Sequence, residues 1–206
     1  MKFNKLALSL ALGLSMGVTM SPAFAADDGT TPTSPAKTAE SSQGTIHFLG
    51  YINDVPCSID DNNLNQTVNF GEIALNELTS GKYRSDEEKF DIVLKNCSIE
   101  TYKNAKISFT GSTVSGFTGF TGFTGELLGL GGKVENAGIV ITDGANTPIV
   151  FGKAFPSVGD GYVLNGGDGS RTTMHFGAYV KGNEADGKKA TTGRFDTVAN
   201  FKVIYQ

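Results

Sequence analysis

Short runs of alternating apolar and polar residues dominate the chain from residue 44 onward. In residues 89–95, for example, Phe90, Ile92 and Leu94 occupy every second position. Successive side chains of an extended strand point to opposite faces, so this pattern predicts a strand with one buried face. The segments that we predict as strands are residues 45–52, 67–73, 89–95, 105–110, 138–142, 148–151, 172–181 and 195–205.

The residues between these runs predict the fold class. Gly, Asn and Asp interrupt the chain at short intervals, the chain has 27 glycines, and no stretch longer than a turn or two has helical periodicity. Residues 73–78 predict at most a short turn of helix. This composition is typical of an all-β domain and favours a β-sandwich, although composition alone leaves a barrel open as well.

The first residues indicate an export signal. Lys2 and Lys5 precede an apolar run over residues 6–18, and Ala23 and Ala25 form the small-residue end that a signal peptidase accepts. We therefore predict a signal peptide at residues 1–25. A first amphipathic or transmembrane helix is the alternative, but polar sequence follows the run and no stop-transfer pattern is present. We expect no membrane span in the mature chain.

The next segment differs in composition from the rest. Residues 26–43 contain no large apolar side chain, so we predict a flexible extension there and a folded domain over residues 44–206. The formal net charge is −4, and basic residues form no cluster. An acidic chain without a basic patch is a poor match for nucleic acid or for anionic lipid, so we expect neither as a partner.

The chain has two cysteines, Cys57 and Cys97. An exported chain meets an oxidising environment, which predicts a disulfide between them. Two free, reactive or metal-binding thiols are the alternative. Neither cysteine lies in a C-x-x-C motif, and no histidine is near enough in sequence to suggest a zinc site.

Residues that could support catalysis are few and scattered. His47 and His175 each lie in an alternating run, where an outward-facing strand residue is a better interpretation than a general base. Residues 129–133 resemble a phosphate-binding loop but lack its required Gly and Ser or Thr, and residues 60–63 lack the ligand spacing of a calcium loop. We therefore expect no enzyme activity, no cofactor and no metal, and we interpret residues 60–63 as a polar turn.

Four segments carry a family resemblance. They are residues 44–52 followed by Pro56-Cys57, residues 68–73, residues 90–97 with the second cysteine, and residues 199–206 with Tyr in the penultimate position. In this order, behind a signal peptide, they resemble the fimbrial subunits that bacteria assemble by the chaperone–usher route, and in particular the major subunits of type 1-like pili. The resemblance spans nearly all of residues 44–206.

This resemblance implies an incomplete immunoglobulin-like β-sandwich that is completed by a donor strand from another subunit. Residues 44–52 would be the donor, with Ile46 and Phe48 filling a groove and with Gly44 and Gly50 where the two backbones come close. The alternative is that residues 44–52 form an ordinary first strand of their own sandwich.

The resemblance also implies the acceptor and the partners. Phe201, Val203, Tyr205 and Gln206 would form the sheet edge that a periplasmic chaperone covers first and a donor strand covers later. The partners would be the chaperone, an outer-membrane usher and neighbouring subunits, and the chain would lie in a fimbrium on the bacterial surface. A minor or adhesive subunit that binds a host glycan is the alternative function.

One repeat fits no motif of this family. Residues 116–125 repeat a Phe-Thr-Gly triplet that places Phe117, Phe120 and Phe123 three positions apart, a period that suits neither a strand nor a helix. The three rings either contact a neighbouring subunit or a host surface, or pack back on their own domain from a glycine-rich loop. We favour the second interpretation.

Overall fold

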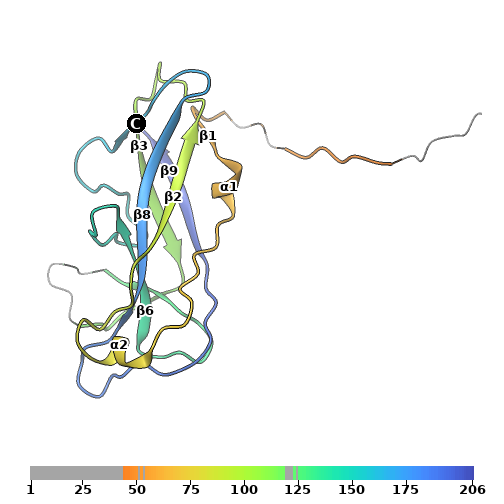
Figure 1. The fold of residues 1–206 in the computed structure, drawn as a ribbon. Helices are drawn as coiled ribbons and strands as arrows, with labels where there is room; N and C mark the ends of the chain where they lie inside the picture. Colours follow the sequence, from red (N-terminus) through yellow and green to blue (C-terminus); the bar gives the residue numbers. More distant parts are fainter. Residues whose placement is uncertain (1–43, 51, 53, 119–122, 124) are drawn as a thin grey trace, which may run out of the picture. The chain divides into compact units, whose positions relative to one another are not determined.

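The computed structural model describes residues 44–50, 52, 54–118, 123 and 125–206 (Figure 1). Residues 44–50 belong to a first unit, and the remaining described residues belong to a second unit, which we call the domain. The predicted signal peptide at residues 1–25 and the predicted extension at residues 26–43 lie outside the described residues.

The domain is almost entirely β-structure. Its elements are β1 (Ser58–Ile59), α1 (Asp61–Leu64), α2 (Leu75–Thr79), β2 (Glu88–Lys95), β3 (Asn104–Gly111), β4 (Thr113–Val114), β5 (Leu127–Gly129), β6 (Ala137–Asp143), β7 (Tyr162–Val163), β8 (Arg171–Gly182) and β9 (Ala199–Tyr205). One sheet has the order β1-β2-β8-β6-β5-β4 and the other the order β7-β3-β9, with antiparallel pairing throughout. The predicted all-β class is confirmed.

Four long strands agree with the prediction to within one residue. β2, β3, β6 and β8 correspond to the runs predicted at residues 89–95, 105–110, 138–142 and 172–181, and α2 lies within two residues of the predicted helical turn. Residues 60–63, which we interpreted as a polar turn, include most of the short helix α1. β1, β4, β5 and β7 have two or three residues each, too few to give a periodic signal.

Four predicted strand segments are wrong in whole or in part. The described residues of 45–52 and all of residues 67–73 have no regular secondary structure, residues 148–151 contribute one isolated bridge from Pro148, and the last predicted strand begins at Ala199 instead of residue 195. An alternating sequence forms a continuous strand only beside a hydrogen-bonded neighbour. Among the described residues, the segment 67–73 pairs with no strand, and residues 148–151 meet β6 only through Pro148 and Ile149.

The core lies between the two sheets. Ile92 and Leu94 of β2 are buried and Phe90 is half-buried, so the face predicted from their spacing is the core face. Phe176 of β8 stacks on Phe90 with ring centroids 5.5 Å apart and meets Phe109 of β3 edge-on at 5.2 Å. These aromatic contacts connect the two sheets at the centre of the domain.

The disulfide between Cys57 and Cys97 is present, as predicted. It connects the residue before β1 to the turn after β2, and both cysteines are buried. Since β1 pairs with the last two residues of β2, the disulfide fixes the pairing of these strands at the same end.

Part of the Phe-Thr-Gly repeat packs back on the domain. Phe117 is half-buried against Leu127, Val140 and Tyr179, a small cluster apart from the main core. The side chain of Asn183 donates to Gly116 O at 3.0 Å and so ties the start of the repeat to the end of β8. Phe123 is half-buried, and Phe120 lies outside the described residues.

Candidate functional site

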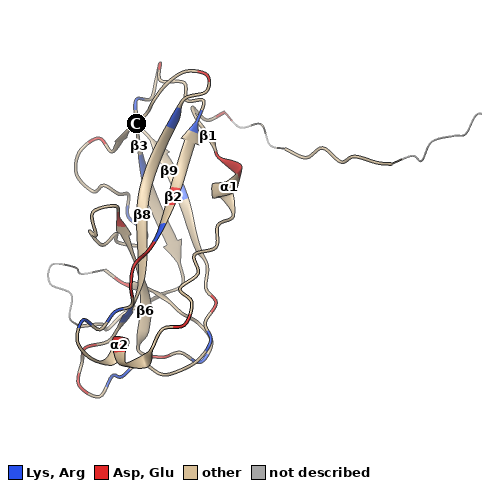
Figure 2. Cartoon of the chain, in the orientation of Figure 1, with Lys and Arg blue, Asp and Glu red and all other residues tan. Residues whose placement is uncertain are grey.

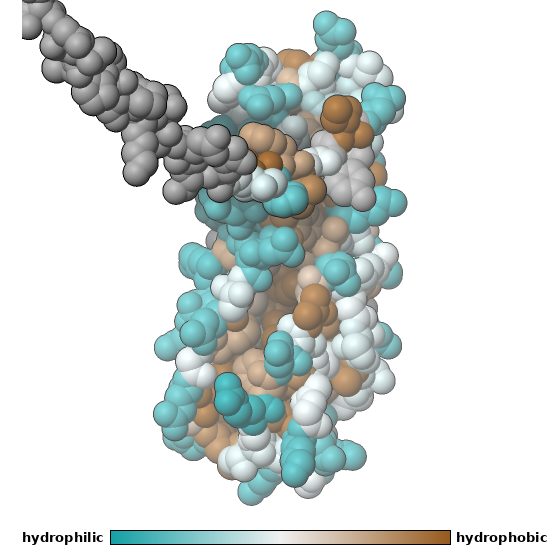
Figure 3. Space-filling model, turned by 90° about the vertical axis from the view of Figure 1, so that its right-hand side faces the viewer, coloured by the Kyte–Doolittle hydropathy of each residue, from teal (hydrophilic) through white to brown (hydrophobic). Residues whose placement is uncertain are grey.

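A long apolar groove runs along the domain between the two sheets. Its volume is about 1170 Å³, and Figure 3 shows hydrophobic surface along a hollow on the face that carries it. Every strand from β2 to β9 except the short β4 and β7 contributes to its lining. The large apolar side chains that line it include Phe70, Ile73, Phe90, Ile92, Phe109, Leu128, Leu130, Ile139, Ile141, Val180, Phe195 and Phe201.

Strand β9 forms one border of this groove, and its outer edge is open. Across the β3–β9 ladder, Ile107 lies opposite Val203. The N–H of Ile107 donates to Phe155 O at 2.9 Å and its carbonyl accepts from Phe155 N–H at 2.6 Å, so both groups point away from β9. In an antiparallel ladder the opposite residue then points away as well, so the N–H and C=O of Val203 face the open edge.

The alternation of backbone direction along β9 shows which other residues belong to its open edge. Phe201 and Tyr205 lie two positions either side of Val203, so their backbone groups also face outward, while all three side chains pack on the core. Among the described residues β9 has β3 as its one neighbouring strand. Gln206 differs, because its N–H donates to Asn104 O at 2.8 Å and its carbonyl accepts from Asn104 N–H at 3.0 Å. Three of the four predicted edge residues therefore present an unpaired backbone at the outer edge of β9, and one of them, Phe201, also lines the groove.

The opposite border of the groove is a segment without a ladder. Residues 67–73 line the groove and turn Phe70 and Ile73 toward the core, and Phe70 lies 6.1 Å from Phe195 between ring centroids. The one hydrogen bond given by the backbone N–H groups of this segment runs from Gly71 to the Asn69 side chain, at 2.9 Å. This border is thus held by side-chain packing and leaves backbone groups available for pairing.

The predicted donor residues lie in the separate unit. Ile46 is 76% exposed, Phe48 87% and Leu49 97%, and the segment has no regular secondary structure. A Cβ added at Gly44 or Gly50 would meet nothing within 4 Å. The structure describes this segment separately from the groove.

Charged groups lie at the rim of the groove and not on its floor. Glu72, Arg194 and Asp196 are exposed along its two borders. Figure 2 shows acidic and basic residues interspersed along the chain, with no long run of one sign. Burial raises the pKa of the Tyr205 hydroxyl, as expected for a ring packed on an apolar core. Such a groove suits an uncharged apolar partner.

The residues considered for catalysis are not assembled into a site. His175 lies exposed on β8, with Nδ1 2.7 Å from Asp91 Oδ1 on the neighbouring strand, and His47 is exposed in the separate unit. In the part of the chain that the structure describes, no three His, Cys, Asp or Glu side chains gather where they could hold a metal. No helix there has the length and apolar character to cross a membrane.

Sequence reasoning missed most of the groove floor. Leu128 and Leu130 come from β5 and the residue just after it, and Phe195 comes from the segment before β9 that was predicted as strand. The apolar run at residues 127–130 was the available signal, but three residues of strand give no period to interpret.

The chain resembles known proteins over most of its length. The family model described as "Fimbrial protein" matches residues 46–206. The "Major MR/P fimbria protein" of Proteus mirabilis is 38% identical over 206 residues, which cover 100% of both chains. The "Fimbria A protein" of Serratia marcescens is 36% identical over 208 residues, again 100% of both chains, and the "Pap fimbrial major pilin protein" of Escherichia coli is 33% identical over 83% of this chain and 88% of its own.

Two solved structures have a similar fold. A chaperone–usher pilus, solved to explain rod uncoiling, matches with a TM-score of 0.62 and 28% identity over 83% of this chain and 100% of that one. The P pilus rod subunit PapA matches with a TM-score of 0.54 and 29% identity over 74% of this chain and 100% of that one.

Proposed function

This chain belongs to the fimbrial protein family, and from that premise we propose that it polymerises by inserting residues 44–52 of one subunit beside β9 of the next. It is a structural pilus subunit with an immunoglobulin-like fold, displayed on the bacterial surface. Its relatives include major subunits of fimbriae, so a major structural role is favoured over a minor, glycan-binding one. The proposal concerns how the subunits join.

One observation carries this proposal: the open edge of β9 lies along an apolar groove. An unpaired edge beside apolar side chains is unfavourable in water and promotes association with another strand. A strand placed there would bond to the backbones of Phe201, Val203 and Tyr205 and would cover the groove floor. The pairing would extend the sheet β7-β3-β9 by one strand.

Residues 44–52 have the pattern that such an insertion needs. In an extended strand Gly44, Ile46, Phe48 and Gly50 share one face, and Thr45, His47 and Leu49 share the other. Burying each large apolar side chain contributes about 1.5–3 kcal/mol, and the ladder hydrogen bonds add to this. Ile46 and Phe48 would fill the groove, and the glycines would lie where it is shallow.

The same edge provides a role for a periplasmic chaperone. A subunit with an open edge and an exposed groove is prone to aggregate, so a chaperone strand would cover β9 until a donor from the next subunit replaces it at an outer-membrane usher. Family membership and the likeness to a chaperone–usher pilus support these two partners. The role we propose is structural and not enzymatic.

The geometry of the contact determines the form of the polymer. Donor segment and groove are different surfaces of one subunit, so each contact runs head to tail and leaves a free donor and a free groove at the two ends. Repetition of such a contact gives an open filament. Because release of a donor would expose the whole groove, dissociation would be slow and the filament kinetically stable.

Electron microscopy of cells that express an Ile46→Asp chain tests the proposal. A carboxylate in the groove lacks a charged partner on the apolar floor, so we expect export and chaperone binding with few or no fibres. Thr45→Asp on the opposite face is the matched control and should form fibres. Normal fibres from Ile46→Asp would overturn the assignment of residues 44–52 as donor.

A further inference from the structure

Strand β2 has a second edge that borders the groove on the side away from β9. β1 pairs with Leu94 and Lys95 alone, so the rest of the outer side of β2 has no neighbouring strand in the described chain. Phe90 and Ile92 of this strand line the groove. An incoming apolar strand could therefore meet two edges, one on each sheet, and the two pairings would compete.

Two side-chain amides and one backbone N–H bond to the outward-facing backbone groups of this second edge. The carbonyl of Val93 accepts from Asp60 N–H at 2.9 Å, and the N–H of Val93 donates to Asn63 Oδ1 at 2.8 Å. Two positions along, the carbonyl of Asp91 accepts from Gln66 Nε2 at 2.8 Å. The N–H of Val93 and the carbonyl of Asp91 are thus bonded to the side chains of Asn63 and Gln66 in place of a strand.

The helix α1 carries Asn63, and Gln66 follows two residues after its end. Asp60 caps it by accepting from Asn62 N–H at 3.3 Å, and its carbonyl accepts from Asn63 N–H at 2.8 Å. The second carboxylate oxygen of Asp60 pairs with Arg171 Nη2 at 2.7 Å, which anchors the cap to β8. Gln66 Nε2 also donates to the backbone carbonyl of Asn63 at 3.3 Å, so the Gln66 side chain is tied to the Asn63 backbone. The backbone turns away from the edge of β2 at α1, while the side chains of Asn63 and Gln66 stay hydrogen-bonded to that edge.

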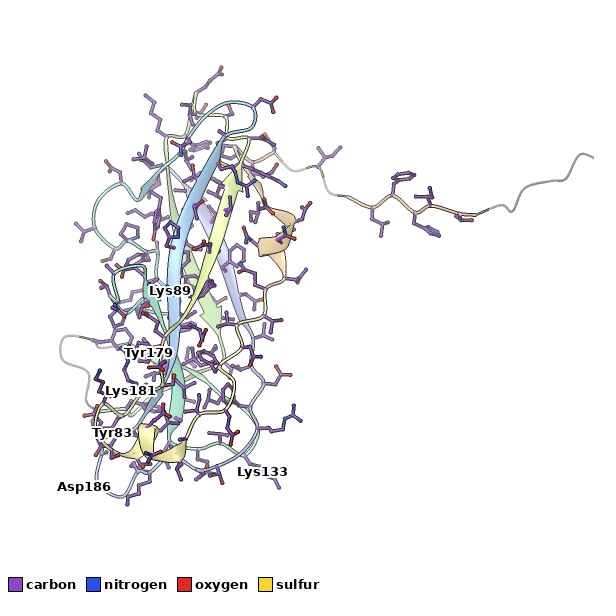
Figure 4. All side chains as sticks on the ribbon, in the orientation of Figure 1. Tyr83, Lys89, Lys133, Tyr179, Lys181 and Asp186 are labelled. Carbon is purple, nitrogen blue, oxygen red and sulfur yellow. A yellow bond between two sulfur atoms is a disulfide. The ribbon has the colours of Figure 1, made fainter. Side chains whose placement is uncertain are left out.

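We infer that Asn63 and Gln66 are positioning residues for assembly, which close the edge of β2 so that an incoming strand pairs with β9. This inference rests on the proposed function and adds how the donor selects its edge. A specific contact needs the competing contact to be disfavoured as well as its own contact to be favourable. Lys89, the next outward-facing residue of β2 and labelled in Figure 4, is exposed, and a lysine on an edge further disfavours strand pairing.

The test compares Asn63→Leu combined with Gln66→Met against two controls. The double variant keeps the approximate size of both side chains and removes both hydrogen bonds to β2. Asn63→Asp keeps an oxygen that accepts from Val93 N–H, and Asn62→Ala changes an exposed side chain of the same helix. Thermal unfolding of each chaperone-bound subunit shows whether the domain has folded.

Two measurements then show whether fibres form and which strand edge, β2 or β9, becomes paired. Electron microscopy gives the yield and regularity of fibres, and hydrogen exchange by mass spectrometry, on chaperone-bound and assembled protein, gives the protection of peptides covering β2 and β9. We expect the wild-type chain and both controls to form regular fibres with β9 protected. In the double variant we expect about tenfold faster exchange at Val93 before assembly, since its hydrogen bond is gone. After assembly we expect fewer fibres, irregular aggregates and new protection over β2.

The outcomes separate the two proposals. A folded double variant that forms regular fibres at the wild-type yield, with protection confined to β9, would overturn the role of Asn63 and Gln66 while leaving the donor assignment intact. Wild-type fibres in which β9 exchanges freely would overturn the proposed function itself, and the edge selection with it. Loss of fibres in Asn63→Asp as well as in the double variant would also count against edge closure, because that variant retains the acceptor.

Discussion

Replacing Phe48 by Ala in the donor segment should weaken subunit joining by a predictable amount. Phe48 is 87% exposed in the structure, so nearly all of its side chain is available for burial in the groove of a neighbour. Full burial of a large apolar side chain contributes about 1.5–3 kcal/mol, and Ala retains a small part of this. We expect a loss of about 2 kcal/mol, which corresponds to roughly a thirtyfold weaker contact.

Leu49 provides the matched control. It is 97% exposed and adjacent in sequence, but in an extended strand it lies on the face opposite Phe48. Leu49→Ala removes a side chain of similar apolar character from the solvent-facing side, so we expect at most a few-fold effect on the contact. The comparison isolates the face that enters the groove from general changes in the hydrophobicity of the segment.

A competition assay measures both changes. A labelled peptide of residues 44–52 displaces the chaperone from the acceptor groove of a chaperone-bound subunit, and unlabelled wild-type, Phe48→Ala and Leu49→Ala peptides compete with it for that groove. The reasoning predicts a much higher competing concentration for Phe48→Ala and a near-normal one for Leu49→Ala. Equal competition by all three peptides, or a larger effect at Leu49, would refute the assignment of the groove-facing side.

Three further predictions concern the domain itself. Cys57→Ser with Cys97→Ser opens a loop of 40 positions, and the loop-entropy model gives a loss of about 4 kcal/mol, visible as a lower midpoint in denaturant unfolding of the chaperone-bound subunit. Gly182→Ala should sharply reduce folded protein in expression trials, because its Cβ would lie 2.0 Å from a carbonyl of α2, whereas Ala at Gly44 meets open space. The hydrogen bond from Arg171 lowers the pKa of Asp60, so its stabilisation is present above the ordinary pKa of 3.8 and lost as the pH falls below it, and Asp60→Asn should lose less stability on acidification.

Each of these has a result that contradicts it. Equal denaturant midpoints with and without the disulfide would mean that the crosslink does not constrain the unfolded chain. Normal yields of Gly182→Ala would mean that α2 moves away from β8 at little cost. Parallel acid profiles of the wild-type chain and Asp60→Asn would exclude Asp60 as a source of the pH dependence.

The sequence predicted the strands that already have a long hydrogen-bonded neighbour in the chain. In β2, alternation of Phe90, Ile92 and Leu94 gave the core face correctly because that strand packs against the other sheet along its length. In residues 67–73 the same kind of alternation led to a wrong strand, because the segment borders the open groove and no ladder forms there. Periodicity reports which side chains are buried, and hydrogen-bonded pairing depends on a neighbour that periodicity cannot reveal.

The edge of β9 could be predicted in part. Phe201, Val203 and Tyr205 were identified from the resemblance, and the ladder shows that their backbones face outward, whereas Gln206 bonds to Asn104. The outward direction depends on the register with β3, which a single sequence does not specify. For the same reason Asn63 and Gln66 escaped prediction, since their value lies in hydrogen bonds to a strand about 25–30 positions away.

A cryo-electron microscopy map of the assembled fibre tests the central claim most directly. We predict continuous density that runs from one subunit into the groove of the next, with residues 44–50 paired to the outer edge of β9 and with Ile46 and Phe48 directed at the groove floor. A fibre in which each groove is filled by its own chain, or in which the subunits touch through closed surfaces while β9 stays unpaired, would contradict it.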